Sequence, residues 1–280
     1  MAADHANNKL DDPYHLAVQK ARSERIPAPE PRAIPASPAV VSPHGAQRTI
    51  DAVSLNRATL LENRLVSFQE RTPMTAAFDL LRTRLLMFLR ERNWRTVIVT
   101  SPTPQCGKTV TAINLAMSLS RQKDATTMLV DFDLRKPSVN RYLGVQRSRD
   151  IHDLLSGRAT LTETLYTTDV LGPSLRVLGV NSPVPQPAEV LGSNAMVTLV
   201  EELRSSTPDG IIIFDMPPLL GADDVLAFLP NADGILLVAA SGQSRTQELV
   251  HSQALIPEDK LIGTVFSKSM EPAKQYYHYY

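Results

Sequence analysis

Short runs of apolar residues recur along the chain from residue 96 onward. Almost every position is apolar in the runs TVIVT at 96, TTMLVDFD at 126, LRVLGV at 175, GIIIFD at 210, GILLVAA at 234 and LIGTVF at 261. A strand with one face in water alternates apolar and polar residues, so continuous runs indicate strands that are buried on both faces. The pattern therefore predicts a parallel sheet covered by helices on both sides.

Segments with helical spacing alternate with these runs. They predict crossover helices in VTAINLAMSLSRQ, PAEVLGSNAMVTLVEELRSS and SRTQELVHSQALI. Before the first strand, MTAAFDLLRTRLLMFLRERN predicts an amphipathic entry helix with one apolar face made of Ala77, Leu80, Leu81, Leu85 and Phe88. The fold class that follows is α/β, with a doubly wound, mostly parallel sheet flanked by helices.

Composition divides the chain into three parts. Residues 1–50 contain IPAPEPRAIPASPAVVSPHG, which is dense in proline and alanine without any period, and this predicts a disordered, partly extended segment. Residues 51–270 hold the alternating pattern and are expected to form the folded domain. Residues 271–280 form a tyrosine-rich tail.

Charge and cysteine content narrow the function classes. Lys and Arg total 29 and balance 29 Asp and Glu, so no excess charge draws the chain to nucleic acid. The apolar runs are far shorter than the roughly 20 residues of a membrane-spanning helix, so no direct membrane insertion is expected. The single cysteine, Cys106, excludes an internal disulfide and favours a reducing compartment, the cytoplasm.

The stretch SPTPQCGKT lies between the first predicted strand and the first crossover helix and has the features of a phosphate-binding loop. In the pattern G-x-x-x-x-G-K-[ST], Gly107 is the second glycine, and Pro102 replaces the first. At a helix start, the backbone N–H groups from Gly107 to Val110 can point at an anion. Lys108 can reach β- and γ-phosphates, and Thr109 can offer its hydroxyl to Mg²⁺. Gly-Lys-Thr alone also occurs by chance, so the flanking strand and helix carry the prediction.

Carboxylates follow two other predicted strands. Asp131 and Asp133 lie on the same side of an extended chain because side-chain direction repeats every two residues, and Arg135 would continue that row. Asp215 ends the run GIIIFD. Each acid alone would be an ordinary solvated strand end. Three acids beside a phosphate loop, at the edge where open α/β sheets bind ligands, indicate a site for Mg²⁺ and a nucleotide.

The last residues, KQYYHYY, form a cluster of tyrosines. One interpretation is an aromatic tail that binds cations or other surfaces. Beside a nucleotide site, the favoured interpretation is a phosphorylation substrate. The candidate acceptors are Tyr276, Tyr277, Tyr279 and Tyr280.

Together these motifs resemble the bacterial tyrosine kinases of capsule and exopolysaccharide biosynthesis. The resemblance runs from about Arg71 to the end of the chain: SPTPQCGKT is similar to their Walker A motif, LVDFDLRKPSVNRYLG to Walker A′ and DGIIIFDMPPLLGADD to Walker B. It implies a P-loop NTPase fold, a protein-tyrosine autokinase activity, and ATP and Mg²⁺ as cofactors. It also implies an inner-membrane polysaccharide copolymerase as partner, with the chain cytoplasmic and peripheral to the membrane through it.

The resemblance also implies roles for single residues. The catalytic residues would be Lys108, Asp131 and Asp133, and Asp131 would be the base that accepts the tyrosine proton. The nucleotide-binding residues would be Gly107, Lys108, Thr109 and Val110. The metal-binding residues would be Thr109, Asp133 and Asp215. The autophosphorylated acceptors would be the four tyrosines of the tail.

Two places depart from the resembled kinases. Their entry helix carries a Glu and two Arg, spaced three apart, that join subunits into a ring, whereas this chain has Ala76, Asp79 and Arg82 there. Homo-oligomer formation is therefore open, and weak self-association is expected. The residue after GTVF is Ser267, where the wider superfamily often has an Asn near the adenine, so no adenine contact is assigned.

Two other functions compete with the kinase. A positioning or partition ATPase of the same fold typically has a lysine at the place of Thr103 and no tyrosine tail. A noncatalytic, nucleotide-binding regulator of polysaccharide export would keep the loop but form no phosphotyrosine.

Overall fold

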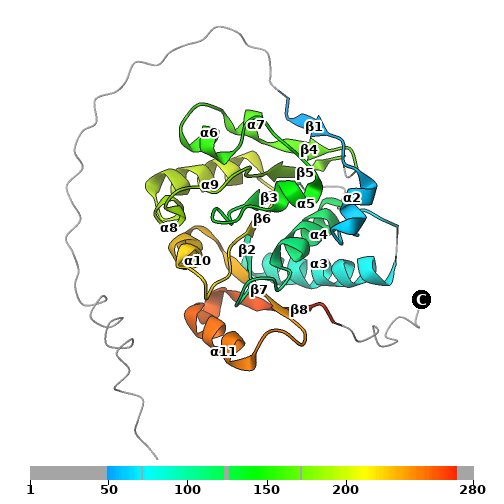
Figure 1. Cartoon of the computed structure of the whole chain (residues 1–280), viewed down its shortest axis with the longest axis vertical. Coiled ribbons are helices and arrows are strands. Elements are labelled where there is room, and N and C mark those ends of the chain that lie inside the picture. The colour runs from blue at the N-terminus through cyan, green and yellow to red at the C-terminus, as the bar shows by residue number, and fades with distance from the viewer. Residues whose placement is uncertain (1–48, 71, 123–125, 171, 270–280) are drawn as a thin grey trace, which may run out of the picture. The chain divides into compact units, whose positions relative to one another are not determined.

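An eight-stranded sheet forms the centre of the domain, as Figure 1 shows. The computed structural model describes residues 49–269 except 71, 123–125 and 171, so the tyrosines of the tail and nearly all of the predicted N-terminal segment lie outside the described residues. The strand order is β1-β4-β5-β3-β6-β2-β7-β8, and every neighbouring pair is parallel except β4 and β5. The mostly parallel α/β sheet is confirmed.

All the strands predicted from apolar runs are present, joined by two short ones. The predicted strands are β2 (Thr96–Thr100), β3 (Thr127–Asp131), β5 (Gly172–Leu178), β6 (Ile211–Asp215), β7 (Gly234–Ala240) and β8 (Leu261–Ser267). The short strands are β1 (Asp51–Val53) and β4 (Tyr166–Thr168), which lie together at one edge of the sheet.

Helices cover both faces of the sheet. One face carries α2 (Arg57–Glu62), α3 (Pro73–Arg92), α4 (Lys108–Ser120) and α5 (Val139–Leu143). The other carries α6 (Ile151–Leu155), α7 (Leu161–Thr164), α8 (Pro187–Leu191), α9 (Asn194–Ser206), α10 (Asp224–Phe228), η1 (Leu229–Asn231) and α11 (Thr246–Leu255), and the short η2 (Glu258–Lys260) leads into β8. In Figure 1, α3 and α4 lie on one side of the sheet and α8, α9 and α10 on the other. No helix in the described part of the chain is both long enough and apolar enough to cross a membrane.

Alternate residues of the central strands feed two separate apolar cores. In β2, Ile98 faces the core with α9 and α10, while Val97 and Val99 face the core with α3 and α4. All three side chains are fully buried. Continuous apolarity arises because each face of the strand needs its own apolar partner.

Two helix predictions need correction. α3 buries Thr75, Leu85, Leu86 and Leu89. The predicted face is confirmed in part, because Leu85 is buried and Leu81 packs against the same core, whereas Leu80 is 46% exposed at a groove between α3 and β8. The helix has apolar residues on more than one face, so periodicity alone does not decide which one packs on the domain. The segment predicted as one crossover helix is broken at Gly192, and Ser193 starts α9 by accepting a hydrogen bond from the Met196 N–H.

Candidate functional site

The phosphate loop runs from the end of β2 into α4. Gly107 is the residue before α4 and has a left-handed conformation with φ of 86°, which glycine adopts without strain. Gln105 also has a positive φ, 64°. The Pro102 carbonyl accepts a hydrogen bond from the Leu220 N–H, 3.1 Å away. The loop therefore turns at Gln105 and Gly107, so the position of Pro102 does not require glycine.

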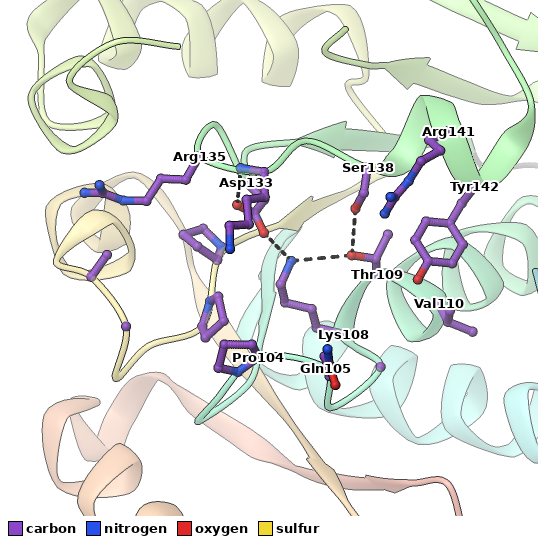
Figure 2. Close-up of a pocket in the computed structure, with 16 residues that line it drawn as sticks. Pro104, Gln105, Lys108, Thr109, Val110, Asp133, Arg135, Ser138, Arg141 and Tyr142 are labelled. Carbon is purple, nitrogen blue, oxygen red and sulfur yellow. Dashed lines mark hydrogen bonds and ion pairs between the residues drawn. The ribbon is translucent and has the colours of Figure 1, made fainter. Parts of the chain in front are cut away.

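Lys108 and Thr109 meet the strand-end acids at the start of α4. The Lys108 ammonium lies 2.7 Å from Asp133 Oδ2 and 3.4 Å from Asp215 Oδ1. The Thr109 hydroxyl donates to Asp215 Oδ2 at 2.6 Å. Figure 2 shows the Lys108 side chain extending toward Asp133 and Thr109 from the loop below them. The structure thus brings together four predicted residues from three separate parts of the chain.

Asp131 occupies a different environment from Asp133. Its carboxylate is fully buried and accepts backbone N–H bonds from Ser138 and Val139, at 2.8 and 2.9 Å, at the start of α5. Its other oxygen accepts from the Asp133 N–H at 3.2 Å. Burial raises the pKa of Asp131 to about 8, the charge of Asp215 adds to the rise, and the N–H donors oppose it. Asp133 lines the pocket and Asp131 does not.

The expected row of Asp131, Asp133 and Arg135 does not form. β3 ends at Asp131, and the Lys136 N–H closes a turn on the Asp133 carbonyl at 3.1 Å. Arg135 instead makes two hydrogen bonds to the buried Asp224 carboxylate on α10, at 2.8 and 2.9 Å. The extended spacing on which the prediction rested stops at the end of the strand.

Aromatic packing holds the two acid-bearing strand ends side by side. Phe132 stacks on Phe214 with ring centroids 5.2 Å apart, and Phe228 of α10 packs edge-on against both. The Phe132 N–H also donates to the Asp215 carbonyl at 2.8 Å. Phe132 and Phe214 are each adjacent in sequence to a site carboxylate, so the core beneath the site fixes where the acids point.

The charges of the site are strongly coupled because they are buried. Burial by itself lowers the pKa of Lys108, but Asp215 and Asp133 more than offset this, so its pKa is raised and the ammonium stays charged. Burial raises the pKa of Asp215, against the opposing effects of Lys108 and the Thr109 hydroxyl. Lys108 contacts two carboxyl groups, those of Asp133 and Asp215, and a bound cation would favour their charged forms.

A pocket of about 460 Å³ opens above the loop. Its walls include Gly107, the first three residues of α4, Asp133 after β3, and Arg141 and Tyr142 from α5. Within the described residues, no group of three His, Cys, Asp or Glu side chains could hold a metal ion. A magnesium site here would use Thr109, Asp215 and Asp133 with phosphate oxygens and water completing the shell, which is the way Mg²⁺ is usually bound. The donors present fit that arrangement.

Ser267 has a structural role that the sequence did not predict. Its hydroxyl donates to the Cys106 carbonyl of the loop at 2.5 Å and lies 3.2 Å from the Ala239 carbonyl. Cys106 is itself buried, with its thiol 3.4 Å from the Ser244 hydroxyl, in keeping with a packing residue. The ends of β7 and β8 thereby hold the loop from behind.

Sequence comparison places the chain among known proteins. No protein-family model matches it. CpsD, a tyrosine-protein kinase of Streptococcus pneumoniae serotype 4, is 32% identical over 180 residues, which cover 62% of this chain and 76% of CpsD. The chain belongs to the bacterial tyrosine-protein kinases. YwqD, a tyrosine-protein kinase of Bacillus subtilis, is 26% identical over 232 residues, covering 82% of this chain and 96% of YwqD.

Other relatives extend the comparison. The succinoglycan biosynthesis transport protein ExoP of Rhizobium meliloti is 29% identical over 181 residues, but the match covers only 22% of ExoP. Among solved structures, the VpsO kinase domain has a TM-score of 0.60 at 29% identity, covering 69% of this chain and 93% of that domain. The match of nearly the whole VpsO domain agrees with the kinase-domain fold described above.

Proposed function

We propose that this chain is an ATP- and Mg²⁺-dependent protein-tyrosine autokinase. The observation that carries the proposal is that Lys108, Thr109 and Asp133 line one pocket with the buried Asp215 bonded directly behind them, in a chain that belongs to the bacterial tyrosine-protein kinases. The acceptors would be Tyr276, Tyr277, Tyr279 and Tyr280, as in the sequence-based prediction.

The chain's own groups have defined tasks in phosphoryl transfer, where positioning and charge neutralisation dominate. The loop N–H groups from Gly107 to Val110 would hold the phosphates. Lys108 would turn from Asp133 to the β- and γ-phosphates. A bound Mg²⁺ would neutralise charge on the phosphate oxygens, and Thr109 and Asp215 would hold it.

Asp133 is the carboxylate that a tyrosine hydroxyl can reach in this conformation, because it lines the pocket. Asp131, the base implied by the resemblance, does not line the pocket, and both its oxygens accept backbone N–H bonds. Asp133 accepts from the Lys136 N–H and the Lys108 ammonium, and it would be freed for a tyrosine when Lys108 turns to the phosphates. We therefore assign proton acceptance to Asp133, in place of the metal-binding role implied by the resemblance, and to Asp131 the holding of Asp133 and the start of α5.

The decisive experiment incubates purified full-length protein with ATP and Mg²⁺ and detects phosphotyrosine with an antibody. Lys108→Met should abolish the signal and weaken nucleotide binding. Asp133→Asn should lower the rate on the order of a hundredfold or more and leave nucleotide affinity nearly unchanged, because a positioned base contributes about that much. Asp131→Asn should lower both the rate and the melting temperature.

Two outcomes would overturn parts of this assignment. Loss of activity in Asp131→Asn at an unchanged melting temperature, with an active Asp133→Asn, would return the base to Asp131. Nucleotide binding without any phosphotyrosine would favour the noncatalytic regulator.

Truncation after Lys274 tests the acceptors. It should remove self-labelling but leave phosphorylation of an added tyrosine peptide; self-labelling that persists would place the acceptors elsewhere.

We further propose that the chain acts in capsule or exopolysaccharide production with an inner-membrane copolymerase. The resemblance of its motifs and the name of ExoP, a succinoglycan biosynthesis transport protein, support this. ExoP is much longer than the match, so its additional segments could correspond to a separate partner here. Co-purification of the chain with membranes only when the copolymerase is co-expressed would test the partner and the peripheral location together.

A further inference from the structure

A second hollow lies beside the nucleotide pocket, on the other side of α5. Its volume is about 760 Å³, and it is formed by the segment from Pro137 to Arg147 together with Val180 and Asn181 beyond β5. Arg141 lies in the walls of both hollows. Figure 2 shows the Arg141 side chain between Ser138 and Tyr142, extending from α5 toward the nucleotide pocket. The two hollows are therefore separated by about one side chain.

The charge of this second hollow is positive. Its lining includes the two cations Arg141 and Arg147 and no Asp or Glu. Within the described residues, Arg141 makes no ion pair and only approaches the Tyr142 ring, 5.5 Å from its centroid. Arg147 pairs with Asp51 at 2.9 Å, but Asp51 is 67% exposed, and the buried Arg147 Nε has no hydrogen-bond partner. Arg141 thus keeps its whole guanidinium for an anion, and Arg147, whose Nε is buried, keeps the donors of its terminal nitrogens, one of which bonds the exposed Asp51.

The polar wall of the hollow is rigid. The buried Tyr166 hydroxyl donates to Asn140 Oδ1 at 2.7 Å, and Asn140 Nδ2 donates to Asn181 Oδ1 at 3.0 Å. Asn181 in turn donates to the Arg147 carbonyl at 2.8 Å. Because the Asn140 and Asn181 side chains already bond to each other and to their neighbours, the wall keeps its shape. These amides do not bind the arginine side chains, which stay available to a ligand. Apolar side chains of Pro137, Val145 and Val180 complete the lining.

We propose that this hollow binds the phosphorylated side chain of a tyrosine that the enzyme has already modified. A dianionic phosphate matches two guanidinium groups, and the apolar lining matches an aromatic ring, so an aryl phosphate fits better than a bare phosphate ion. The inference rests on the proposed kinase function. The acceptor candidates are adjacent or separated by one residue, so one phosphotyrosine in the second hollow would hold the next hydroxyl at the nucleotide pocket. The first phosphorylation would then promote the following ones.

Binding is tested directly, without turnover, on the full-length protein with ADP and Mg²⁺. The probe is a fluorescent peptide with the sequence of residues 270–280, prepared with and without phosphate on Tyr277, and binding is read as anisotropy. We expect the phosphopeptide to bind about tenfold more tightly, since a charge-assisted hydrogen bond contributes that much. Arg141→Ala and Arg147→Gln should each remove the difference, and phenyl phosphate should compete better than inorganic phosphate.

Two matched controls separate this effect from loss of structure. Arg149→Gln removes a neighbouring guanidinium that pairs with Glu163 and lies outside the hollow, so it should leave binding unchanged. Asp51→Asn removes the ion pair of Arg147 but keeps its guanidinium, so binding should persist.

Equal affinity for the two peptides, or arginine variants without effect, would overturn the proposal. Equal competition by inorganic phosphate would mean a small-anion site only. If the kinase assay fails, the binding results can still be interpreted, because they do not depend on turnover.

Discussion

Ser267 shows how one hydroxyl can set the shape of a phosphate loop. Its bond to the Cys106 carbonyl joins the last strand of the sheet to the residue before Gly107. A β-carbon built on Gly107 would lie 3.3 Å from the Ser267 hydroxyl, so the two residues also limit each other's position. The loop N–H groups that would hold phosphate follow immediately in sequence, and their direction depends on this contact.

We expect Ser267→Ala to weaken ATP binding by about three- to tenfold, because the loop loses one net hydrogen bond that orients it. Ser267→Thr keeps the hydroxyl and should restore affinity. Titration with a fluorescent ATP analogue measures both. Ser205→Ala, which removes an exposed helix-surface hydroxyl, is the control. Unchanged affinity in Ser267→Ala would show that the loop keeps its shape without this contact.

Asp131 makes the stability of the free protein depend on pH. Its pKa is about 8 in the fold and about 3.9 when unfolded, so the folded state binds the proton more tightly. The stabilising effect of the neutral form is complete below about pH 4 and is lost as pH rises through about 8. Differential scanning calorimetry in EDTA should therefore show a melting temperature that falls from pH 5.5 to 8.5.

Asp131→Asn should flatten this slope, because its side chain is neutral throughout. The variant should melt below the wild type at low pH, since an amide has one acceptor oxygen where the carboxyl group uses two, which leaves the Asp133 N–H without an acceptor. The gap should narrow as pH rises. Asp209→Asn, at an exposed loop position, should keep the wild-type slope. Parallel curves for wild type and Asp131→Asn would contradict the raised pKa.

At the scale of elements, a single buried amide joins α4 to the segment between α2 and α3. Asn114 Oδ1 accepts from the Val66 and Ser67 N–H groups at 2.8 and 3.0 Å, and its amide donates to the Arg64 and Val110 carbonyls. Asn114 is fully buried in the middle of α4. It satisfies backbone groups of Arg64, Val66 and Ser67, which lie between α2 and α3.

Asn114→Ala should lower the free energy of unfolding by about 2–4 kcal/mol, because it leaves two buried N–H groups without acceptors. Urea denaturation measures this. Asn194→Ala, at an exposed position of α9, should cost no more than about 0.5 kcal/mol. A loss as small as that of the control would mean that water replaces the amide and that the segment is held by its apolar contacts.

The elements found from sequence differ from those missed in length and burial. β2, β3, β6 and β7 are buried on both faces, so apolarity alone marks them. β1 and β4 have three residues each, and α5, α6, α7 and α10 have four or five, which is too short for a period to be visible.

The residues of the site also divide into those that the sequence predicted and those that it missed. Lys108, Thr109, Asp133 and Asp215 were predictable because parallel strands and a following helix bring their ends to one edge. The separate environments of Asp131 and Asp133 were not, because they depend on where β3 ends. Ser267 acts through a contact between segments that are distant in sequence, and no local pattern records such a contact.

At the scale of the whole molecule, the entry helix uses its charges within its own subunit. The Arg82 guanidinium donates to Asp79 Oδ1 at 3.0 Å and to the Ser118 carbonyl of α4 at 2.9 Å. The Ser118 hydroxyl donates to the same Asp79 oxygen at 2.8 Å. Ala76 provides no charge. The acid and base that could face another subunit therefore neutralise each other on α3 and α4.

This closed cluster predicts a mostly monomeric protein at micromolar concentration, since attraction between subunits lacks its charged partners. Autophosphorylation per molecule should then rise with protein concentration, because we expect the tail of one copy to enter the pocket of another, and it should rise further with a partner that gathers copies. Sedimentation velocity and initial-rate measurements over a dilution series test both.

The double variant Ala76→Glu, Asp79→Arg recreates the acid and two bases of the resembled kinases and should self-associate more strongly. The control variant Thr83→Ala, on the same helix, should not. A stable ring of the wild-type chain, or a rate per molecule unaffected by dilution, would show that other contacts assemble it.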